Sequence, residues 1–474
     1  MTILANMSPM QLTEFNAAVL ASGGDGVARG LARLGQNGAL TAFVGDSQTA
    51  YGVNFTGGVV AKSFYGYSTH VLHLCPQLYS PVLGNAANNP TNQGMNFGVG
   101  GETLAQIGAR MPGVLASAPA LIIGKGGTND LSAYATGPTV RAATIFATLL
   151  NSIILPAHNA GIPIVWGTIS PRGGLTTAQR QIKRAFNDLL RALPTQLAGV
   201  YVFDSTPFLT DFANTSDRGA PITGYTADGV HYNNVGCYAE ARLAIKPIVD
   251  KLIPPRLARF VEPGATYDAT LNPGGSFLTP AGVESGYFLG TGGTLTAATG
   301  FTPSGEIATG WQGKQYSNSG TATATMVCSK GLVPNSTMPL QAATITTTAA
   351  AGLAQYGFAT NISSSALTLG DWFTASINYA FATPPTGHIT LMLNIQLLGV
   401  SGNVYDGSAG AGGNFSIPVA VMGADNGRLE TPPIQWPAGA TGAILNVIEF
   451  VDTTPGASVQ LSIWNAEVHK VAAP

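Results

Sequence analysis

The chain carries little charge. Only 9% of its 474 residues are Asp, Glu, Lys or Arg, against about a quarter in ordinary soluble domains. The 21 basic and 23 acidic side chains give a net charge of −2, and no basic block occurs. A nucleic-acid partner would need Lys and Arg to neutralise phosphates, so the composition argues against one. Hydrophobic residues make up 45% of the chain, which argues against disorder.

Cysteines and long apolar runs are also scarce. Cys75, Cys237 and Cys328 lie far apart and form no C-x-x-C pair, so no disulfide framework is expected. No run of eighteen apolar residues occurs, and residues 1–6 lack the basic and apolar regions of a secretory signal. We therefore expect no membrane span and no signal peptide, and a cytoplasmic location stays open.

The few charges are unevenly spread, which divides the chain in two. Residues 1–262 hold 17 of the 21 basic side chains, whereas residues 263–474 hold four of them and four of the five tryptophans. The change falls near Ile253-Pro254-Pro255, where the prolines end a helix-like stretch. We predict an N-terminal segment, an α/β domain, a linker and an all-β domain, at residues 1–37, 38–253, 254–264 and 265–474.

The first part alternates short apolar runs with helix-like stretches. Five runs are typical of buried parallel strands: Leu40–Val44, Gly94–Phe97, Ala120–Ile123, Pro163–Gly167 and Val200–Phe203. The helix-like stretches are Val59–Leu74, Val140–Ala157, Thr176–Ala192 and Val235–Leu252. This alternation predicts a three-layer α/β/α domain with a mostly parallel five-stranded sheet. In such folds the functional site forms at the carboxyl ends of the strands.

Some of the basic residues of this part lie on an amphipathic helix. In the helix expected at Thr176–Ala192, apolar side chains recur at helical spacing, with Arg180, Lys183 and Arg184 on the opposite face. Arg172, which follows a predicted strand, could contact an anionic substrate, and a plain surface charge is the alternative.

The second part has almost no helical period. Its alternating runs are separated by Gly, Pro and Asn clusters, which is typical of antiparallel strands. The runs are Thr321–Val327, Trp372–Phe381, Ile389–Leu397, Ile444–Phe450 and Ser458–Trp464. We predict a β-sandwich of the jelly-roll type.

Two motifs follow the first two predicted strands. Leu40–Val44 runs into Gly45-Asp46-Ser47-Gln48, where a serine just past a strand projects its Oγ over the sheet edge. The alternative is an ordinary turn with a helix N-cap. The second strand runs into residues 96–103, Asn-Phe-Gly-Val-Gly-Gly-Glu-Thr, whose glycines permit a backbone amide to point into a cleft. A plain strand-to-helix turn is the alternative there.

Two further motifs come later. The third strand ends in residues 126–130, Gly-Gly-Thr-Asn-Asp, where the amide of Asn129 could donate to a developing oxyanion. An Asx turn is the alternative. Asp228 and His231 stand three positions apart before the last helix of the domain, so the carboxylate can reach the imidazole Nδ1 and fix its tautomer. A lone histidine is more often structural.

Together, in this order and spacing, the four motifs resemble the sequence blocks of the GDSL or SGNH hydrolase family, over about residues 38–250. The resemblance implies that Ser47 is the nucleophile, that His231 is the general base and that Asp228 orients the histidine. It also implies an oxyanion hole made of the backbone N–H groups of Ser47 and Gly101 and the side-chain amide of Asn129.

The match departs from the family pattern at two places. Glu102 stands where the family usually has Asp, and Gln48 follows the serine where the family name has Leu. No catalytic position is missing. Serine is a poor nucleophile at neutral pH, so a neighbouring imidazole must take its proton as it attacks an acyl carbon. The expected reaction is ester hydrolysis through an acyl-enzyme, without metal or cofactor.

One histidine cluster suggests a metal site at first sight. His70, His73 and Cys75 stand together at the end of a predicted apolar helix. A tetrahedral site needs a fourth ligand and a cleft, so we interpret these residues as core packing.

The tryptophans of the second part raise the possibility of carbohydrate binding. Exposed rings can stack on sugars, although most large aromatics in a sandwich belong to the core. Trp464 alternates with the apolar residues of its strand, and Trp311 follows a stretch that reads as a loop. We take Trp311 and Trp464 as candidate substrate-binding residues.

An SGNH-type domain joined to a charge-poor β-module resembles tail-associated esterases of bacteriophages. This resemblance implies removal of O-acetyl groups from bacterial surface polysaccharide, a virion location and a homo-oligomer such as a trimer. Two alternatives stay open. A lipase or thioesterase would show activity that rises with acyl chain length, and a catalytically silent protein would bind glycan without hydrolysing any ester.

Overall fold

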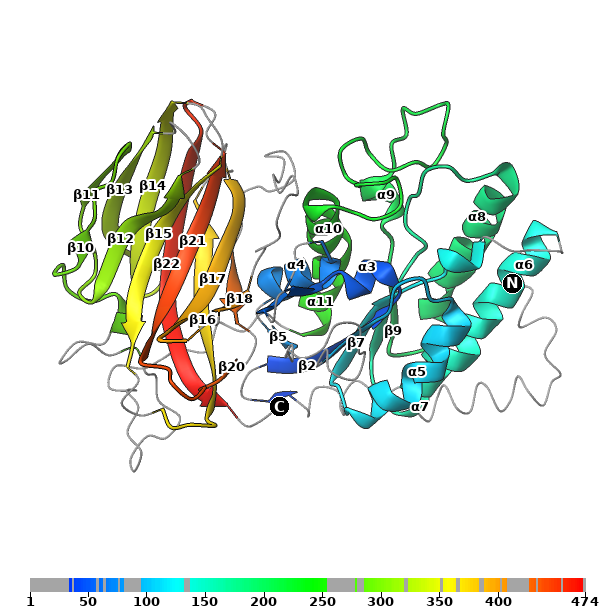
Figure 1. Cartoon of the computed structure of the whole chain (residues 1–474). Coiled ribbons are helices and arrows are strands. Elements are labelled where there is room, and N and C mark those ends of the chain that lie inside the picture. The colour runs from blue at the N-terminus through cyan, green and yellow to red at the C-terminus, as the bar shows by residue number, and fades with distance from the viewer. Residues whose placement is uncertain are drawn as a thin grey trace.

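The computed structural model places an α/β domain beside a β-sandwich (Figure 1). The predicted linker and nearly all of the predicted N-terminal segment lie outside the residues that the structure describes. The described residues are 34–35, 38–56, 59–62, 65–75, 77–80, 95–131, 137–253, 278, 285–318, 323–349, 353–363, 367–382, 388–400, 403–406, 426–431, 434–452 and 455–471.

The α/β domain is built on five parallel strands, as predicted. In spatial order they are β6 (Asn96–Gly98), β2 (Gly38–Gly45), β7 (Leu121–Lys125), β8 (Ile164–Gly167) and β9 (Val200–Phe203). Two short strands also pair with β2: β1 (Leu34–Gly35) runs antiparallel to it and β5 (Leu78–Tyr79) runs parallel. The central strands are mostly apolar because helices cover both faces of the sheet.

Alternate residues of each strand pack under different helices, which confirms the three layers. Val44, Ile122 and Trp166 lie in one apolar cluster, together with residues of α5 (Leu104–Ala116), α6 (Pro138–Leu149), the π-helical turn η4 (Leu150–Ile154), α7 (Leu155–Asn159) and α8 (Thr177–Ala192). Phe43 and Ile123 face the other side. There they meet α4 (Tyr67–Leu74), α10 (Asn234–Ala239), the π-helical turn η6 (Glu240–Ile245) and α11 (Lys246–Leu252).

The stretch Pro138–Asn159, which comprises α6, η4 and α7, has 22 residues and a mean hydropathy of 1.5, enough to cross a membrane by length and composition. Its buried side chains, among them Ile145, Leu149 and Ile153, belong to the core cluster of the α/β domain. The apolar side chains of this stretch therefore pack in the core of the α/β domain.

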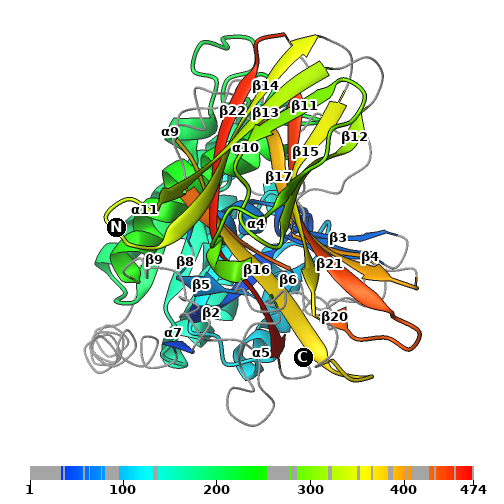
Figure 2. The same ribbon diagram turned by 90° about the vertical axis from the view of Figure 1, so that its left-hand side faces the viewer.

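The predicted helix Val59–Leu74 is wrong in its first half. Only Tyr67–Leu74 is helical, and Val59–Lys62 forms the strand β4. β4 pairs with β3 (Val53–Thr56) in a hairpin and, in parallel, with β18 (Asn403–Asp406) of the sandwich. Figure 2 shows this hairpin beside the sandwich. The partner strand lies more than 300 residues away, so no local pattern indicates the pairing.

The second part is a sandwich of two mostly antiparallel sheets, which confirms the prediction. One sheet has the order β10-β12-β15-β21-β17-β18-β4-β3, and the other has the order β11-β13-β14-β22-β16-β19, with β20 beside β16. The new bounds are β10 (Thr294–Leu295), β11 (Phe301–Gly305), β12 (Trp311–Asn318), β13 (Thr323–Leu332), β14 (Pro339–Ala349), β15 (Leu353–Ile362), β16 (Trp372–Phe381), β17 (His388–Leu398), β19 (Asn426–Glu430), β20 (Ile434–Gln435), β21 (Gly442–Asp452) and β22 (Ser458–Val471).

One apolar cluster joins the two halves of the molecule. It holds Tyr67 and Val71 of α4 together with residues from both sheets of the sandwich, such as Phe358 and Ile463. The helix α4 thus lies between the parallel sheet and the sandwich (Figure 1).

Candidate active site

The turn after β2 presents Ser47. Asp46 caps the short helix α3 (Ser47–Ala50), with its Oδ1 accepting a hydrogen bond of 3.0 Å from the backbone N–H of Gln48. Gly45 is required by space, because a Cβ at this position would lie 2.3 Å from the carbonyl oxygen of Lys125. The turn can therefore form only where the chain has a glycine, a capping residue and the serine in succession.

The structure brings Ser47, His231 and Asp228 together. The Oγ of Ser47 lies 2.9 Å from Nε2 of His231, and Nδ1 of the same ring lies 2.7 Å from Oδ2 of Asp228. A carboxylate accepts a hydrogen bond, so the ring proton belongs on Nδ1. That tautomer leaves Nε2 free to accept the proton of Ser47.

The loop that carries Asp228 and His231 is fixed by its own backbone. Oδ1 of Asp228 accepts hydrogen bonds from the backbone N–H groups of Val230 (2.9 Å) and His231 (2.7 Å). Although partial burial opposes the carboxylate charge, these bonds and the His231 ring lower the pKa of Asp228 to about 2. Asp228 is therefore ionised at neutral pH and can stabilise an imidazolium.

Two contacts hold this loop against the serine turn. The side-chain amide of Gln48 donates to the carbonyl oxygen of Val230 at 3.1 Å. The ring of Tyr51, which is 44% exposed, lies against the ring of His231 with 5.1 Å between their centroids. Gln48, the departure from the family name, thus connects the two loops that carry the serine and the histidine.

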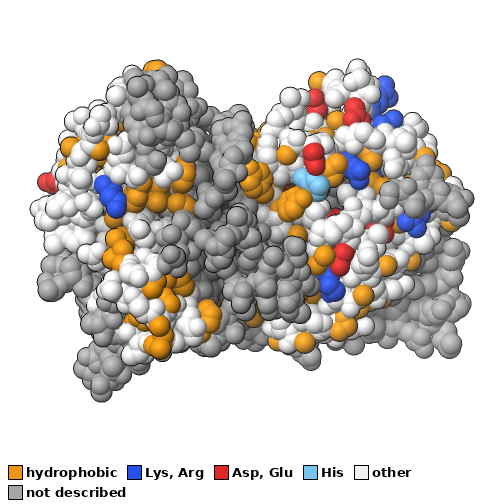
Figure 3. All heavy atoms as spheres, in the orientation of Figure 1, with side chains coloured by type: hydrophobic (Ala, Val, Ile, Leu, Met, Phe, Trp, Pro, Cys, Tyr) orange, Lys and Arg blue, Asp and Glu red, His pale blue; other side chains and the backbone are white. Residues whose placement is uncertain are grey.

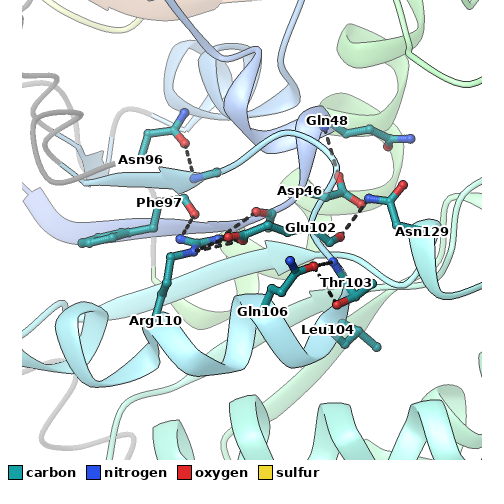
Figure 4. A network of polar contacts seen from close by, with 12 residues as sticks. Asp46, Gln48, Asn96, Phe97, Glu102, Thr103, Leu104, Gln106, Arg110 and Asn129 are labelled. Atoms are coloured by element: carbon teal, nitrogen blue, oxygen red, sulfur yellow. Dashed lines mark hydrogen bonds and ion pairs between the residues drawn. The ribbon is translucent and has the colours of Figure 1, made fainter. Parts of the chain in front are cut away.

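The predicted oxyanion residues lie at the same edge of the sheet. Gly101 has φ +80°, a left-handed conformation that favours glycine, and a Cβ on neighbouring Gly100 would lie 3.9 Å from Cβ of Ser47. The amide of Asn129 donates a hydrogen bond of 2.8 Å to the carbonyl oxygen of Glu102 (Figure 4). This bond orients Asn129 toward the 100–103 segment, and the role of both residues in an oxyanion hole stays a prediction.

Glu102 has a structural partner that no local sequence pattern indicates. Its carboxylate forms an ion pair with Arg110 of α5. Arg110 also donates to the carbonyl oxygens of Phe97, at the end of β6, and Gly45, at the end of β2 (Figure 4). One guanidinium therefore joins two strand ends to the segment with the predicted oxyanion glycine.

A buried ion pair that the sequence patterns do not predict lies in the same domain. Nζ of Lys125, at the end of β7, is 2.7 Å from a carboxylate oxygen of Glu240, and both side chains are almost fully buried. Ser170 and Ser205 donate to the same carboxylate. A lysine at the end of an apolar strand was the only signal in the sequence, and its partner is 115 residues away.

Asp46 is also buried. Burial raises its pKa to about 6, although the hydrogen bond from Gln48 and the charges of Lys125 and His231 act in the opposite direction. A carboxylate buried directly before the serine lowers the stability of the folded state when it is ionised.

The remaining candidates lie in the core. His70, His73 and Cys75 are each at most 2% exposed, and the His70 ring lies edge-on to Tyr238 with 5.6 Å between centroids. Within the described residues, no group of three or more His, Cys, Asp or Glu side chains could hold a metal ion.

The two tryptophans differ from each other. Trp311 is not in a loop: it begins β12, is 1% exposed and stacks on Phe288 with 4.7 Å between ring centroids. Its ring is buried in the core, so it cannot stack on a sugar. Trp464 is partly exposed and alternates with the buried Leu461 and Ile463, as expected.

A comparison with protein families identifies the domain. The sequence model of the GDSL-like lipase/acylhydrolase family matches residues 43–238, which include all the predicted catalytic residues. Residues 43–238 form a GDSL-like acylhydrolase domain. No curated protein matches the chain.

Several solved structures are similar to parts of the chain. An acetyl xylan esterase, AlAXEase, is 20% identical with a TM-score of 0.29, covering 42% of this chain and 95% of the esterase. The enzymatically active domain of tailspike protein 4 of bacteriophage CBA120 is 16% identical (TM-score 0.23; 34% of this chain, 20% of that one). The C-terminal family 22 carbohydrate-binding module of Clostridium thermocellum Xyn10B is 14% identical (TM-score 0.21; 35% and 88%). The family match, and not these distant structures, identifies the acylhydrolase domain.

Proposed function

We propose that the acylhydrolase domain is a serine esterase in which Ser47 is the nucleophile, His231 the general base and Asp228 the residue that orients the histidine. The observation that carries the proposal is the continuous hydrogen-bond chain from Ser47 Oγ through His231 to Asp228, with distances of 2.9 and 2.7 Å. A serine, an imidazole and an ionised carboxylate in this geometry make a nucleophile active at neutral pH.

The reaction proceeds in two halves. Ser47 Oγ bonds to the acyl carbon while its proton passes to Nε2 of His231, and the tetrahedral intermediate carries a negative oxygen. The bond to the leaving alcohol then breaks, and Nε2 returns the proton to that alcohol. Water attacks the acyl-enzyme by the same steps and releases the acid. Asp228 stabilises the imidazolium in both halves.

The negative oxygen of the intermediate needs donors. We assign them to the backbone N–H groups of Ser47 and Gly101 and to the side-chain amide of Asn129, whose orientation is fixed through Glu102. Each such donor typically lowers the barrier by roughly 2.7–4 kcal/mol.

We infer that the substrate is an O-acetylated polysaccharide. Two features of the sandwich support this. It has few basic residues, and a groove of about 320 Å³ on it is lined by neutral polar groups, including Gln312, Thr360 and Asn361, with Lys314 as the one charged residue of its described lining. Hydroxyl-rich, uncharged ligands suit such a surface. The sandwich is also joined to the acylhydrolase domain through β4 and β18, so a bound glycan would be held near the enzyme.

The test is hydrolysis of p-nitrophenyl esters, from acetyl to decanoyl, by the wild type and by Ser47→Ala. We expect activity that is highest on the acetyl ester and that falls by about 10⁶-fold in the variant. Release of acetate from acetylated polysaccharide then tests the substrate. Full activity of Ser47→Ala would contradict the proposed nucleophile, and a preference for long acyl chains would indicate a lipase.

A further inference from the structure

A second cavity of the α/β domain lies outside the Ser47–His231 site. It has a volume of about 250 Å³ and is formed by α8 and the loop that precedes α10. Five basic side chains line it, from a chain with only 21. They are Arg180, Lys183, Arg184, Arg191 and Arg218. In a chain with so little charge, this is a strong local concentration of positive charge.

Lys183 is the most unusual of these groups. Helical spacing predicts that Lys183 lies on the solvent face of α8, but the residue is only 9% exposed. In the described part of the chain it makes no ion pair and no side-chain hydrogen bond. Burial lowers its pKa to about 8, so it still carries its proton at pH 7. A buried cation without a partner is costly unless a ligand supplies the opposite charge.

The nearest acids do not neutralise the cavity. Asp204 is engaged by Arg191 at 2.8 Å and by the backbone N–H of Thr206 at 3.0 Å. Among the described residues that line the cavity, Asp188 is the only acid, and it pairs with Arg191 at 2.8 Å and with Arg184 at 3.9 Å. Asp217 lies 3.8 Å from the guanidinium of Arg180, so three acids face the five cations. The five cations are therefore left with a net positive charge.

Two arginines have unpaired side-chain donors. Arg218, one of the five, is exposed and, among the described residues, has no hydrogen-bond or ion-pair partner. The guanidinium of Arg172, close enough to Lys183 for their charges to interact, donates to the carbonyl oxygen of Thr128 at 3.3 Å, and its buried Nε has no partner in the described structure.

We propose that this cavity binds a doubly charged tetrahedral oxyanion, either free phosphate or sulfate or the phosphate monoester group of a larger ligand, with Lys183 and Arg218 as its main ligands. Arginine forks match the oxygens of such anions, and an ammonium adds a compact charge. A singly charged carboxylate would leave most of the positive charge uncompensated. The inference stands independently of the proposed esterase function, because binding is measured without turnover.

The cavity adjoins the loop of the candidate active site. Arg172 N–H donates to the carbonyl oxygen of Gly219, which lines the cavity, at 3.2 Å, and Gly173 N–H donates to that of Gly229 at 2.9 Å. Gly229 lies between Asp228 and His231. In Figure 3, Lys and Arg side chains gather on the upper part of this domain, close to an exposed histidine. An anion in the cavity would thus lie beside the loop that carries the catalytic histidine.

The test measures binding of inorganic phosphate, inorganic sulfate and a sugar phosphate to the full chain by calorimetry and thermal unfolding, with a uronic acid as the singly charged comparison. At about 100 times its Kd, phosphate should raise Tm by roughly 3–6 °C. Lys183→Met keeps the buried stem and removes the charge, so the variant should fold and its phosphate Kd should rise at least about tenfold. Arg218→Gln, at an exposed position, should also weaken binding. Lys251→Met, on the exposed end of α11, is the matched control and should bind like the wild type.

The outcomes are distinct. Weaker phosphate binding in Lys183→Met and Arg218→Gln but not in Lys251→Met supports the site, and tighter binding of the sugar phosphate than of free phosphate identifies an ester as its occupant. No Tm shift with any of the three anions in the wild type would overturn the proposal. Equal binding by all variants, or tighter binding of a uronic acid than of phosphate, would also overturn it.

Discussion

The two halves of the molecule differ in their basic residues. The α/β domain encloses a buried ion pair, Lys125–Glu240, a buried carboxylate, Asp46, and a cavity lined by basic residues. The sandwich also buries acidic side chains, Glu449 and the Glu467–His469 pair, but residues 263–474 hold only four of the 21 basic side chains. Positive charge is therefore concentrated in the half that carries the candidate active site.

This contrast exists within one connected body. The helix α4 packs in the same apolar cluster as both sheets of the sandwich, and the β3–β4 hairpin, which follows the serine turn in the chain, extends a sandwich sheet. The two halves therefore pack as one body despite their difference in basic residues.

After the loss of Ser47 itself, the largest effect should come from the hydrogen-bonded carboxylate of the active site. Asp228→Asn keeps the shape but cannot hold the proton on Nδ1 of His231, so kcat on p-nitrophenyl acetate should fall by roughly 10²–10⁴-fold. Asp211→Asn is the control, because its Oδ1 only accepts from the backbone N–H of Ala213 in the same loop region. Equal activity of Asp228→Asn and Asp211→Asn would refute the role of Asp228.

The second prediction compares a buried ion pair of the α/β domain with a more exposed ion pair of the sandwich. Lys125→Met should destabilise this domain by about 3–5 kcal/mol, because Glu240 would stay buried without its partner. Arg428→Met removes an ion pair of the sandwich that is longer (3.6 Å) and more exposed, so its loss should be smaller. Urea unfolding followed through the helical circular dichroism signal measures the first variant and through tryptophan fluorescence the second. A larger loss in Arg428→Met would reverse the comparison.

The sequence predicts the site well where the signal is local. Ser47 directly follows an apolar strand, and Asp228 and His231 stand three positions apart, so their placement depends on short stretches of chain. All five predicted parallel strands are present, because a strand buried on both faces has to be apolar throughout.

The features that escaped prediction depend on distant partners. β4 is a strand because β18 lies beside it, and Lys125 is buried because Glu240 is opposite. Lys183 is buried although helical periodicity places it in solvent, and it lines a cavity together with Arg218. Trp311 is buried because Phe288 stacks on it. Periodicity describes one element at a time and cannot report such contacts.

The third prediction separates core packing from binding in the sandwich. Trp311→Ala should destabilise the protein by about 3–5 kcal/mol, as expected for a large side chain removed from the core. Trp464→Ala, at a partly exposed position, should cost much less stability. If Trp464 contacts glycan, its variant should bind acetylated polysaccharide more weakly at unchanged Tm. Affinity electrophoresis and thermal unfolding of both variants measure the two effects, and unchanged binding by Trp464→Ala would remove it from the candidate binding residues.

The last prediction concerns one acid in each half. Burial raises the pKa of Asp46 to about 6 from its ordinary 3.8, so the folded state holds a proton that the unfolded state releases. The stabilisation is complete below about pH 3.8 and is lost as the pH rises through about 6, a change on the order of 3 kcal/mol. Asp46→Asn keeps an acceptor for Gln48 N–H and should remove this pH dependence.

Asp371 of the sandwich should behave in the opposite way. Slight burial opposes its charge, but Lys470 at 2.7 Å and the hydrogen bonds from Thr368 lower the pKa of the Asp371 carboxyl. Its stabilisation is present above its ordinary pKa and is lost as the pH falls, and the effect is small because the pair is exposed. Urea unfolding between about pH 2 and about pH 7 compares wild type, Asp46→Asn and Asp371→Asn. If Asp46→Asn retains the wild-type slope, the serine turn does not hold a strained carboxylate, and the electrostatic contrast between the halves then depends on Lys125–Glu240 and the basic cavity.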